Sequence, residues 1–98
     1  MKKTVLVIDD DQKLIQLLTE YLGGHGYQVL GAGGGELGLK LLTKHKPDLV
    51  ILDVMLPDKS GFEVCKEIRA GSSVPVLMLT ARGELTDRVV GQIGRAHV

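Results

Sequence analysis

TVLVIDDDQ, residues 4–12, joins an uninterrupted apolar run to three consecutive carboxylates. A short apolar run of this kind is typical of a strand that is buried on both faces, as in a parallel sheet covered by helices. Two carboxylates ~4 Å apart repel each other by ~1 kcal/mol in water and by ~4 kcal/mol at an effective dielectric near 20. Negative charge concentrated at the end of a buried strand therefore predicts a positively charged partner at that place.

The same pattern recurs along the chain and alternates with helical patterns. DLVILD (48–53) and VPVLMLT (74–80) are further candidates for buried strands, and YQVLGA (27–32) is a weaker candidate that we expect at an edge. Between and after them, apolar residues recur at helical spacing. These stripes are Leu14, Leu17, Leu18, Tyr21 and Leu22; Leu37, Leu41 and Leu42; Phe62, Cys65 and Ile68; and Leu85, Val89 and Ile93. Four strand–helix alternations predict an α/β fold with a parallel sheet and right-handed crossovers.

Polar residues close three of the four predicted strands: Asp9 with Asp10, then Asp53, then Thr80. Parallel strands carry their carboxyl ends at one edge of the sheet, where α/β proteins bind ligands at the point where the strand order reverses. If the first and third strands flank that point, the three carboxylates converge and either raise a pKa or hold a cation. Mg²⁺ takes oxygen ligands and favours sites that a phosphate completes. The pattern thus predicts a magnesium site that receives a phosphoryl group.

The composition favours one small cytoplasmic domain. The chain has 98 residues, with 12 basic and 12 acidic side chains, no Trp and a single cysteine, Cys65. Balanced charge gives no field that would attract nucleic acid or an anionic membrane. The apolar run near the N-terminus is too short for a signal peptide, and no run approaches the ~20 apolar residues of a membrane span. We expect Cys65 to be a core residue, because it lies on the apolar stripe of its helix.

Three quoted stretches carry a resemblance to a known family. VLVIDDD at the end of the first strand, DLVILDVMLPDKSG around the third and VPVLMLTA at the fourth resemble the receiver domain of bacterial two-component response regulators. The order and spacing of the three stretches agree with that family from about Thr4 to Gly91. The resemblance implies a flavodoxin-like, doubly wound parallel sheet, here with strand order 2-1-3-4.

The family resemblance also implies a role for each residue at the strand ends. Asp53 matches the residue that accepts a phosphoryl group from a histidine kinase, and Asp9 and Asp10 match the acidic pair that holds Mg²⁺. Met55 stands where the family uses a backbone carbonyl as a metal ligand, and Thr80 matches the hydroxyl that turns toward the phosphoryl oxygens. The implied protein is a phosphoacceptor switch more than an enzyme.

The C-terminal part departs from the family pattern. The fifth strand, its helix and a lysine near the strand end have no counterpart in GQIGRAHV, residues 91–98. We therefore interpret residues 1–91 as a C-terminally truncated receiver domain and residues 92–98 as a non-native tail, since IGRAHV is what a common sequencing adapter encodes. The expected partners are a sensor histidine kinase and a second copy of the chain, because the fourth strand would offer an open sheet edge. DNA would be contacted only through an absent C-terminal effector domain, and no membrane is involved.

Two alternatives remain beside this interpretation. Gly33, Gly35 and Gly38 have the spacing of a dinucleotide-binding turn, which would make the chain a Rossmann half-domain; otherwise these glycines loosen a turn. The acidic residues after the first strand could instead begin a helix, where negative charge complements the helix dipole. We assign that simpler role to Asp11 alone, because it does not explain why Asp53 closes another strand.

Overall fold

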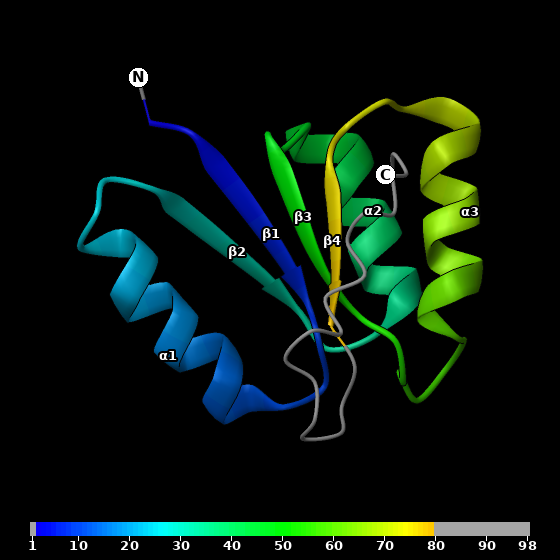
Figure 1. Ribbon diagram of the computed structural model, residues 1–98, viewed down its shortest axis with the longest axis horizontal. Coiled ribbons are helices and arrows are strands. Elements are labelled where there is room, and N and C mark those ends of the chain that lie inside the picture. Colours follow the sequence, from blue (N-terminus) through cyan, green and yellow to red (C-terminus); the bar gives the residue numbers. More distant parts are fainter. Residues whose placement is uncertain (1, 80–98) are drawn as a thin grey trace.

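The structure is a computed structural model that describes residues 2–79, in which strands and helices alternate as predicted (Figure 1). The elements are β1 (Thr4–Ile8), α1 (Gln12–Gly23), β2 (Gln28–Ala32), α2 (Gly35–His45), β3 (Leu49–Asp53), α3 (Gly61–Gly71) and β4 (Val76–Leu79). Thr80, the stripe from Leu85 to Ile93 and the tail at 92–98 lie outside the described residues, so the interpretations placed on them stay predictions.

The four strands form one parallel sheet in the order β2-β1-β3-β4, which confirms the expected order. β1 lies in the middle, so that Val5 is opposite Val29 of β2 on one side and Leu49 of β3 on the other. β2 is an edge strand, as its weaker apolar pattern predicts. The chain places β2 on one side of β1 and then crosses to place β3 on the other side. The carboxyl ends of β1 and β3 therefore flank the point where the strand order reverses.

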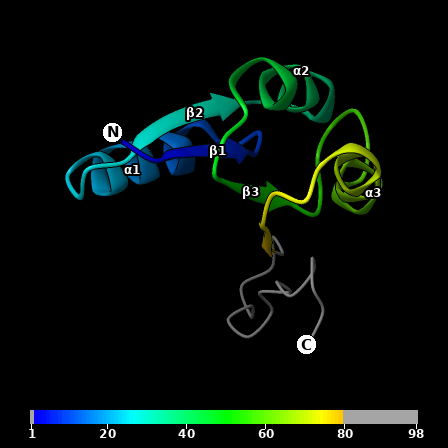
Figure 2. The same ribbon diagram turned by 90° about the horizontal axis from the view of Figure 1, so that it is seen from above.

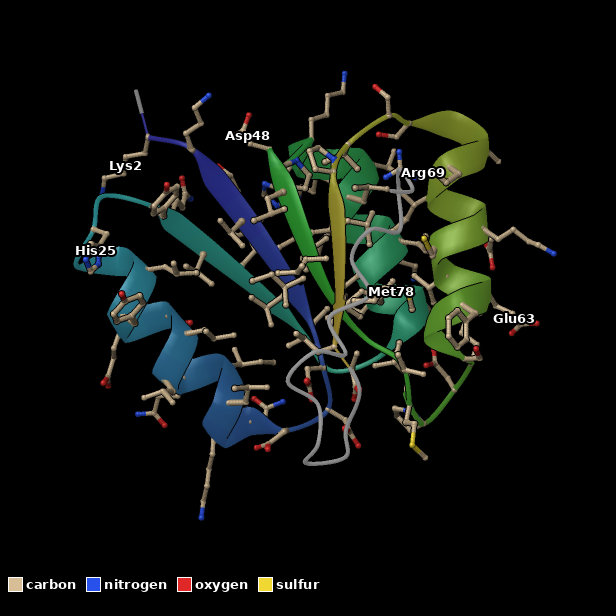
Figure 3. The ribbon with its side chains drawn as sticks, in the orientation of Figure 1. Lys2, His25, Asp48, Glu63, Arg69 and Met78 are labelled. Atoms are coloured by element: carbon tan, nitrogen blue, oxygen red, sulfur yellow. The ribbon has the colours of Figure 1, made fainter. Side chains whose placement is uncertain are left out.

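Helices cover both faces of the sheet, and alternate residues of each strand supply two apolar cores. α1 packs on one face, against Val5, Val7 and Ile51, while α2 and α3 pack on the other (Figure 2). Strands buried on both faces are what the continuous apolar runs predict. In the larger core Met78 of β4 lies on the side of α3 (Figure 3). The buried members of that core are Leu6, Ile8, Ala32, Val50, Leu52, Val64, Cys65, Ile68, Val76 and Met78.

The apolar stripe of α1 faces the sheet in a different phase from the one the leucine spacing suggests. Ile15, Leu18 and Leu22 pack against the sheet, whereas Leu17 and Tyr21 are exposed. Nearly every position of this helix that could face the sheet carries a large apolar residue, so the pattern alone does not determine its rotation. Asp11 is the N-cap of α1, and its carboxylate accepts from the N–H groups of Lys13 (3.0 Å) and Leu14 (3.2 Å). The simpler role predicted for Asp11 is thereby supported.

In α3 the sequence pattern is right for Cys65 and Ile68 and wrong for Phe62. Cys65 and Ile68 are buried against the sheet, but the Phe62 side chain is 60% exposed. The buried stripe starts at Gly61 instead and continues through Val64, because α3 approaches the end of β3 so closely that no side chain fits there. Among residues 2–79, no helix combines the length and apolar character that crossing a membrane requires.

Candidate metal and phosphoryl site

The carboxyl ends of β1 and β3 bring three aspartates together. Ile8 is opposite Leu52 in the sheet, so Asp9 and Asp53 leave adjacent strands at the same level. One carboxylate oxygen from each of Asp9, Asp10 and Asp53 lies within 4.8 Å of the others. Asp9 and Asp53 are 7% and 6% exposed, whereas Asp10 is exposed to solvent. The convergence expected from the strand ends is therefore present in the folded chain.

The environment of the two buried aspartates disfavours their negative charge. Burial raises the pKa of Asp9 and of Asp53, and the neighbouring carboxylates raise both further. Backbone donors act in the opposite direction: the Asp11 N–H donates to Asp9 Oδ1 (2.8 Å), and the Met55 N–H donates to Asp53 Oδ1 (3.2 Å). These bonds orient each carboxylate but leave the mutual repulsion of the group uncompensated.

The donor set fits a hard divalent cation. Three carboxylates supply only oxygen atoms, and one of them is open to solvent, which suits an ion such as Mg²⁺ that keeps several waters. A bound cation would also neutralise the charge that burial disfavours. Asp9, Asp10 and Asp53 are therefore the residues that would hold the metal. Met55 lies two positions after Asp53, and its side chain is exposed, so only its backbone could serve this site.

The end of β4 lies beside Asp53. Leu79, the last residue of β4, is opposite Asp53, and its carbonyl accepts from the Val54 N–H (3.0 Å). Thr80, the predicted switch hydroxyl, follows directly in the chain but lies outside the described residues. Its role stays a prediction that the neighbouring strand register supports.

Gly61 allows α3 to begin against the last residue of β3. A Cβ atom at Gly61 would overlap the Asp53 carbonyl oxygen and lie 2.8 Å from the Val54 Cα atom, both of which are backbone. The Gly61 N–H donates to the Val54 carbonyl (2.8 Å), and Ser60 caps the helix by accepting from the Phe62 N–H (3.0 Å). The loop that follows Asp53 is thus closed at its base by backbone contacts that only glycine permits.

The glycines of the β2–α2 connection serve packing. A Cβ at Gly38 would lie 2.5 Å from Ile8 Cδ1, and one at Gly35 would lie 2.7 Å from both Lys59 Cγ and Val64 Cγ2. Gly35 and Gly38 therefore let α2 lie close to β1 and α3, which replaces the expectation that they only loosen a turn. This packing explains the two glycines without a bound dinucleotide.

Two residues of the site region were not singled out from the sequence. Asp58 and Lys59 join the loop after β3 to α2 and α3 through hydrogen bonds and ion pairs. A local signal existed, because α2 follows Gly34, a residue with no side chain to cap a helix. The glycine shows that α2 needs an acceptor from elsewhere in the chain, but it does not show that this acceptor is Asp58.

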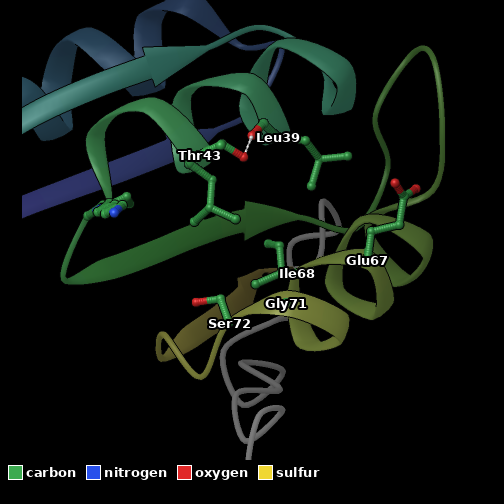
Figure 4. Close-up of a pocket in the computed structure, with 9 residues that line it drawn as sticks. Leu39, Thr43, Glu67, Ile68, Gly71 and Ser72 are labelled. Carbon is green, nitrogen blue, oxygen red and sulfur yellow. Dashed lines mark hydrogen bonds between the residues drawn. The ribbon is translucent and has the colours of Figure 1, made fainter.

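A separate cavity of about 480 Å³ lies between α2 and α3 (Figure 4). Leu39, Leu42 and Ile68 contribute apolar surface, and Thr43 bonds back to the Leu39 carbonyl (3.2 Å). The cavity is lined by the later turns of both helices, whereas the aspartates lie near the helix starts. It is not part of the acidic site.

The sequence matches the model of the response regulator receiver domain family over residues 5–96. It is 47% identical over 92 residues to the alkaline phosphatase synthesis transcriptional regulatory protein PhoP of Bacillus subtilis, a match that covers 93% of this chain and 38% of that protein. It is 43% identical over 91 residues to the DNA-binding response regulator MtrA of Mycolicibacterium smegmatis, covering 93% and 40%. The chain thus spans about two fifths of the length of these relatives.

Solved structures show the same likeness. The chemotaxis response regulator CheY4 of Vibrio cholerae superposes with a TM-score of 0.80 at 33% identity, covering 86% of this chain and 72% of that one. The BeF3-activated N-terminal receiver domain of Klebsiella pneumoniae RstA gives 0.81 at 28% identity, covering 94% and 79%. These similarities confirm the flavodoxin-like fold and favour a receiver domain over the dinucleotide-binding alternative.

Proposed function

Because the chain belongs to the receiver domain family of two-component response regulators, we propose that Asp53 is its phosphoacceptor. Asp9, Asp10 and the Met55 backbone carbonyl would hold Mg²⁺ together with Asp53. The observation that carries this proposal is the convergence of three carboxylates at the point where the strand order reverses. Asp9 and Asp53 are both buried, and a backbone N–H from the following loop orients each of them. Of the two, Asp53 is the one that lies opposite the last residue of β4.

The proposed reaction moves a phosphoryl group from a histidine to an aspartate. A carboxylate oxygen of Asp53 attacks the phosphorus, the P–O bond forms, and the P–N bond to the kinase imidazole breaks as that imidazole leaves with the electron pair. A bound Mg²⁺ supplies positive charge against the phosphoryl oxygens. Asp9 and Asp10 hold that charge in place, while the Met55 N–H fixes the orientation of the Asp53 carboxylate. Positioning and charge neutralisation account for most of the catalysis in such a transfer.

The chain then acts as a switch rather than as a conventional enzyme. Phosphorylation adds roughly −1.5 to −2 charge beside the end of β4, where Leu79 is opposite Asp53. The Thr80 hydroxyl would donate to the phosphoryl group and draw the following segment with it.

A sensor histidine kinase is the proposed donor, and a second copy of the chain is a proposed partner. The proposed location of the chain is the cytoplasm. The similarity to transcriptional regulators supports an output on DNA through a C-terminal effector domain.

Phosphorylation with a small donor tests the assignment. We expect the 98-residue chain, incubated with acetyl phosphate and Mg²⁺, to gain the mass of one phosphoryl group, and the gain to depend on the metal. Asp53→Asn should abolish it. Asp48→Asn, at the amino end of β3 and so at the other end of the strands from the aspartates, should leave the labelling intact. Labelling that persists in Asp53→Asn would refute Asp53 as the acceptor.

A further inference from the structure

α2 is capped by a residue that lies far from it in sequence. Its N-cap, Gly34, offers no side chain. Instead, Asp58 of the β3–α3 loop accepts from the Gly35 N–H at Oδ1 (2.8 Å) and from the Glu36 N–H at Oδ2 (2.9 Å). The first amides of a helix have no acceptor inside it, and a carboxylate there also complements the helix dipole. The Glu36 amide, followed by the Gly35 amide, lowers the pKa of Asp58, so the cap is ionised at neutral pH.

Lys59 ties the same loop to both helices. Its Nζ lies 3.0 Å from Glu36 Oε2 on α2 and 2.9 Å from Glu67 Oε2 on α3. The Lys59 side chain is only 19% exposed, although both glutamates are largely open to solvent. Its stem lies over Gly35, where a Cβ would be 2.7 Å from Lys59 Cγ. Asp58 and Lys59, together called the loop clamp, thus hold the tip of the β3–α3 loop on α2.

The base of the same loop is held at the acidic site. The Val54 N–H donates to Leu79, the Gly61 N–H donates to Val54, and Met55 forms an isolated antiparallel bridge with Ser60. Met55 therefore lies on a short segment that is anchored to the sheet at its base and to α2 at its tip. Without the loop clamp, this segment would be held only by its base and by the packing of the partly buried Leu56 against the larger core.

We propose that Asp58 is a positioning residue that raises the Mg²⁺ affinity of the acidic site by holding the Met55 segment in place, with Lys59 supporting it. This inference rests on the proposed function, in which the Met55 carbonyl is a metal ligand. Ordering a loop costs conformational entropy. When the loop is already held in the folded chain, metal binding does not incur that cost, and the site binds more tightly.

Mg²⁺ titration by calorimetry tests the proposal, at a temperature where each variant is folded. Outer residues that orient metal ligands typically change metal affinity by 10–100-fold, so we expect Asp58→Ala to weaken Mg²⁺ binding about tenfold, the lower end of that range. Asp58→Asn should weaken it less than Asp58→Ala, because the asparagine amide oxygen can still accept from one of the two N–H groups, although its NH2 group cannot accept from the other. Lys59→Met keeps the stem, removes both ion pairs, and should also weaken binding. If Asp58→Ala does not fold, the Mg²⁺ affinities of Asp58→Asn and Lys59→Met test the proposal in its place.

Asp48→Ala is the matched control. Asp48 Oδ2 accepts from the Thr4 N–H (2.8 Å), and the residue lies at the start of β3, at the opposite edge of the sheet (Figure 3). We expect this variant to melt at a lower temperature with unchanged Mg²⁺ affinity. An Asp58→Ala chain that is less stable but binds Mg²⁺ as tightly as the parent would overturn the inference, and loss of binding in Asp53→Asn would show that the proposed function still stands. A parent chain that binds no Mg²⁺ would overturn both.

Discussion

Replacing Asp53 with asparagine should stabilise the metal-free protein, even though it removes the proposed phosphoacceptor. The carboxylate oxygens of Asp9, Asp10 and Asp53 lie within 4.8 Å of one another, and Asp9 and Asp53 are almost fully buried. Asparagine keeps the size of the side chain and an oxygen that can accept from the Met55 N–H. The substitution therefore removes negative charge from the cluster and little else.

The expected gain follows from the geometry. Two unit charges 4.8 Å apart interact by about 3.5 kcal/mol at an effective dielectric of 20 and by about 0.9 kcal/mol in water. The Asp9–Asp53 pair is buried and lies nearer the first value, whereas Asp10 is exposed and lies nearer the second. Partial protonation and salt reduce both terms. We expect the free energy of unfolding of metal-free Asp53→Asn to exceed that of the parent by about 1–3 kcal/mol at pH 7.

Thermal unfolding followed by far-UV circular dichroism measures this difference. In EDTA the melting temperature of Asp53→Asn should exceed that of the parent by roughly 4–8 °C for each kcal/mol gained. Mg²⁺ should reduce or reverse this difference in melting temperature, because the parent binds Mg²⁺ more tightly than Asp53→Asn does. A ligand at ten times its Kd stabilises the folded state by about 1.4 kcal/mol. Asp48→Asn removes the same charge at the other edge of the sheet and should show neither effect. An Asp53→Asn chain that is no more stable than the parent in EDTA would refute the reasoning.

Three further predictions concern pH, a glycine and a helix cap. In the folded state the pKa values of Asp9 and Asp53 lie above the ordinary value of 3.8. The folded metal-free parent therefore binds more protons than the unfolded chain, and its stability falls as pH rises through the raised pKa values. Unfolding in EDTA across that range should show the advantage of Asp53→Asn growing with pH, and a constant advantage would contradict the assignment. Gly61→Ala should cost roughly 2–3 kcal/mol in urea unfolding, because its Cβ would meet backbone. Gly71→Ala, which meets nothing within 4 Å, should be near neutral, and equal effects would show that the contact at Gly61 is relieved elsewhere. Asp11→Ala should cost about 1 kcal/mol by the same assay through loss of the α1 cap, and an unchanged stability would mean that another acceptor replaces it.

The types of the elements and the place of the acidic site were predictable from the sequence. Continuous apolar runs specify strands buried on both faces, and Asp9, Asp10 and Asp53 follow two of these runs directly. Parallel strands carry their ends to one edge, so the three aspartates converge once the first and third strands are neighbours, which is the strand order that the family resemblance implies. No contact between distant side chains has to be known to reach it.

Only the tertiary structure decided which surfaces meet. The apolar residues of α1 outnumber those that the sheet can cover, so the choice of Ile15 over Leu17 depends on how the helix lies across the strands. Phe62 is exposed because the close approach of Gly61 to Asp53 sets the rotation of α3. The bonds from Asp58 to the start of α2 join residues 22 and 23 positions apart, and no local period encodes a pairing at that distance. Such contacts depend on how separate elements pack together. Sequence periodicity specifies only which residues share a face of one helix or strand.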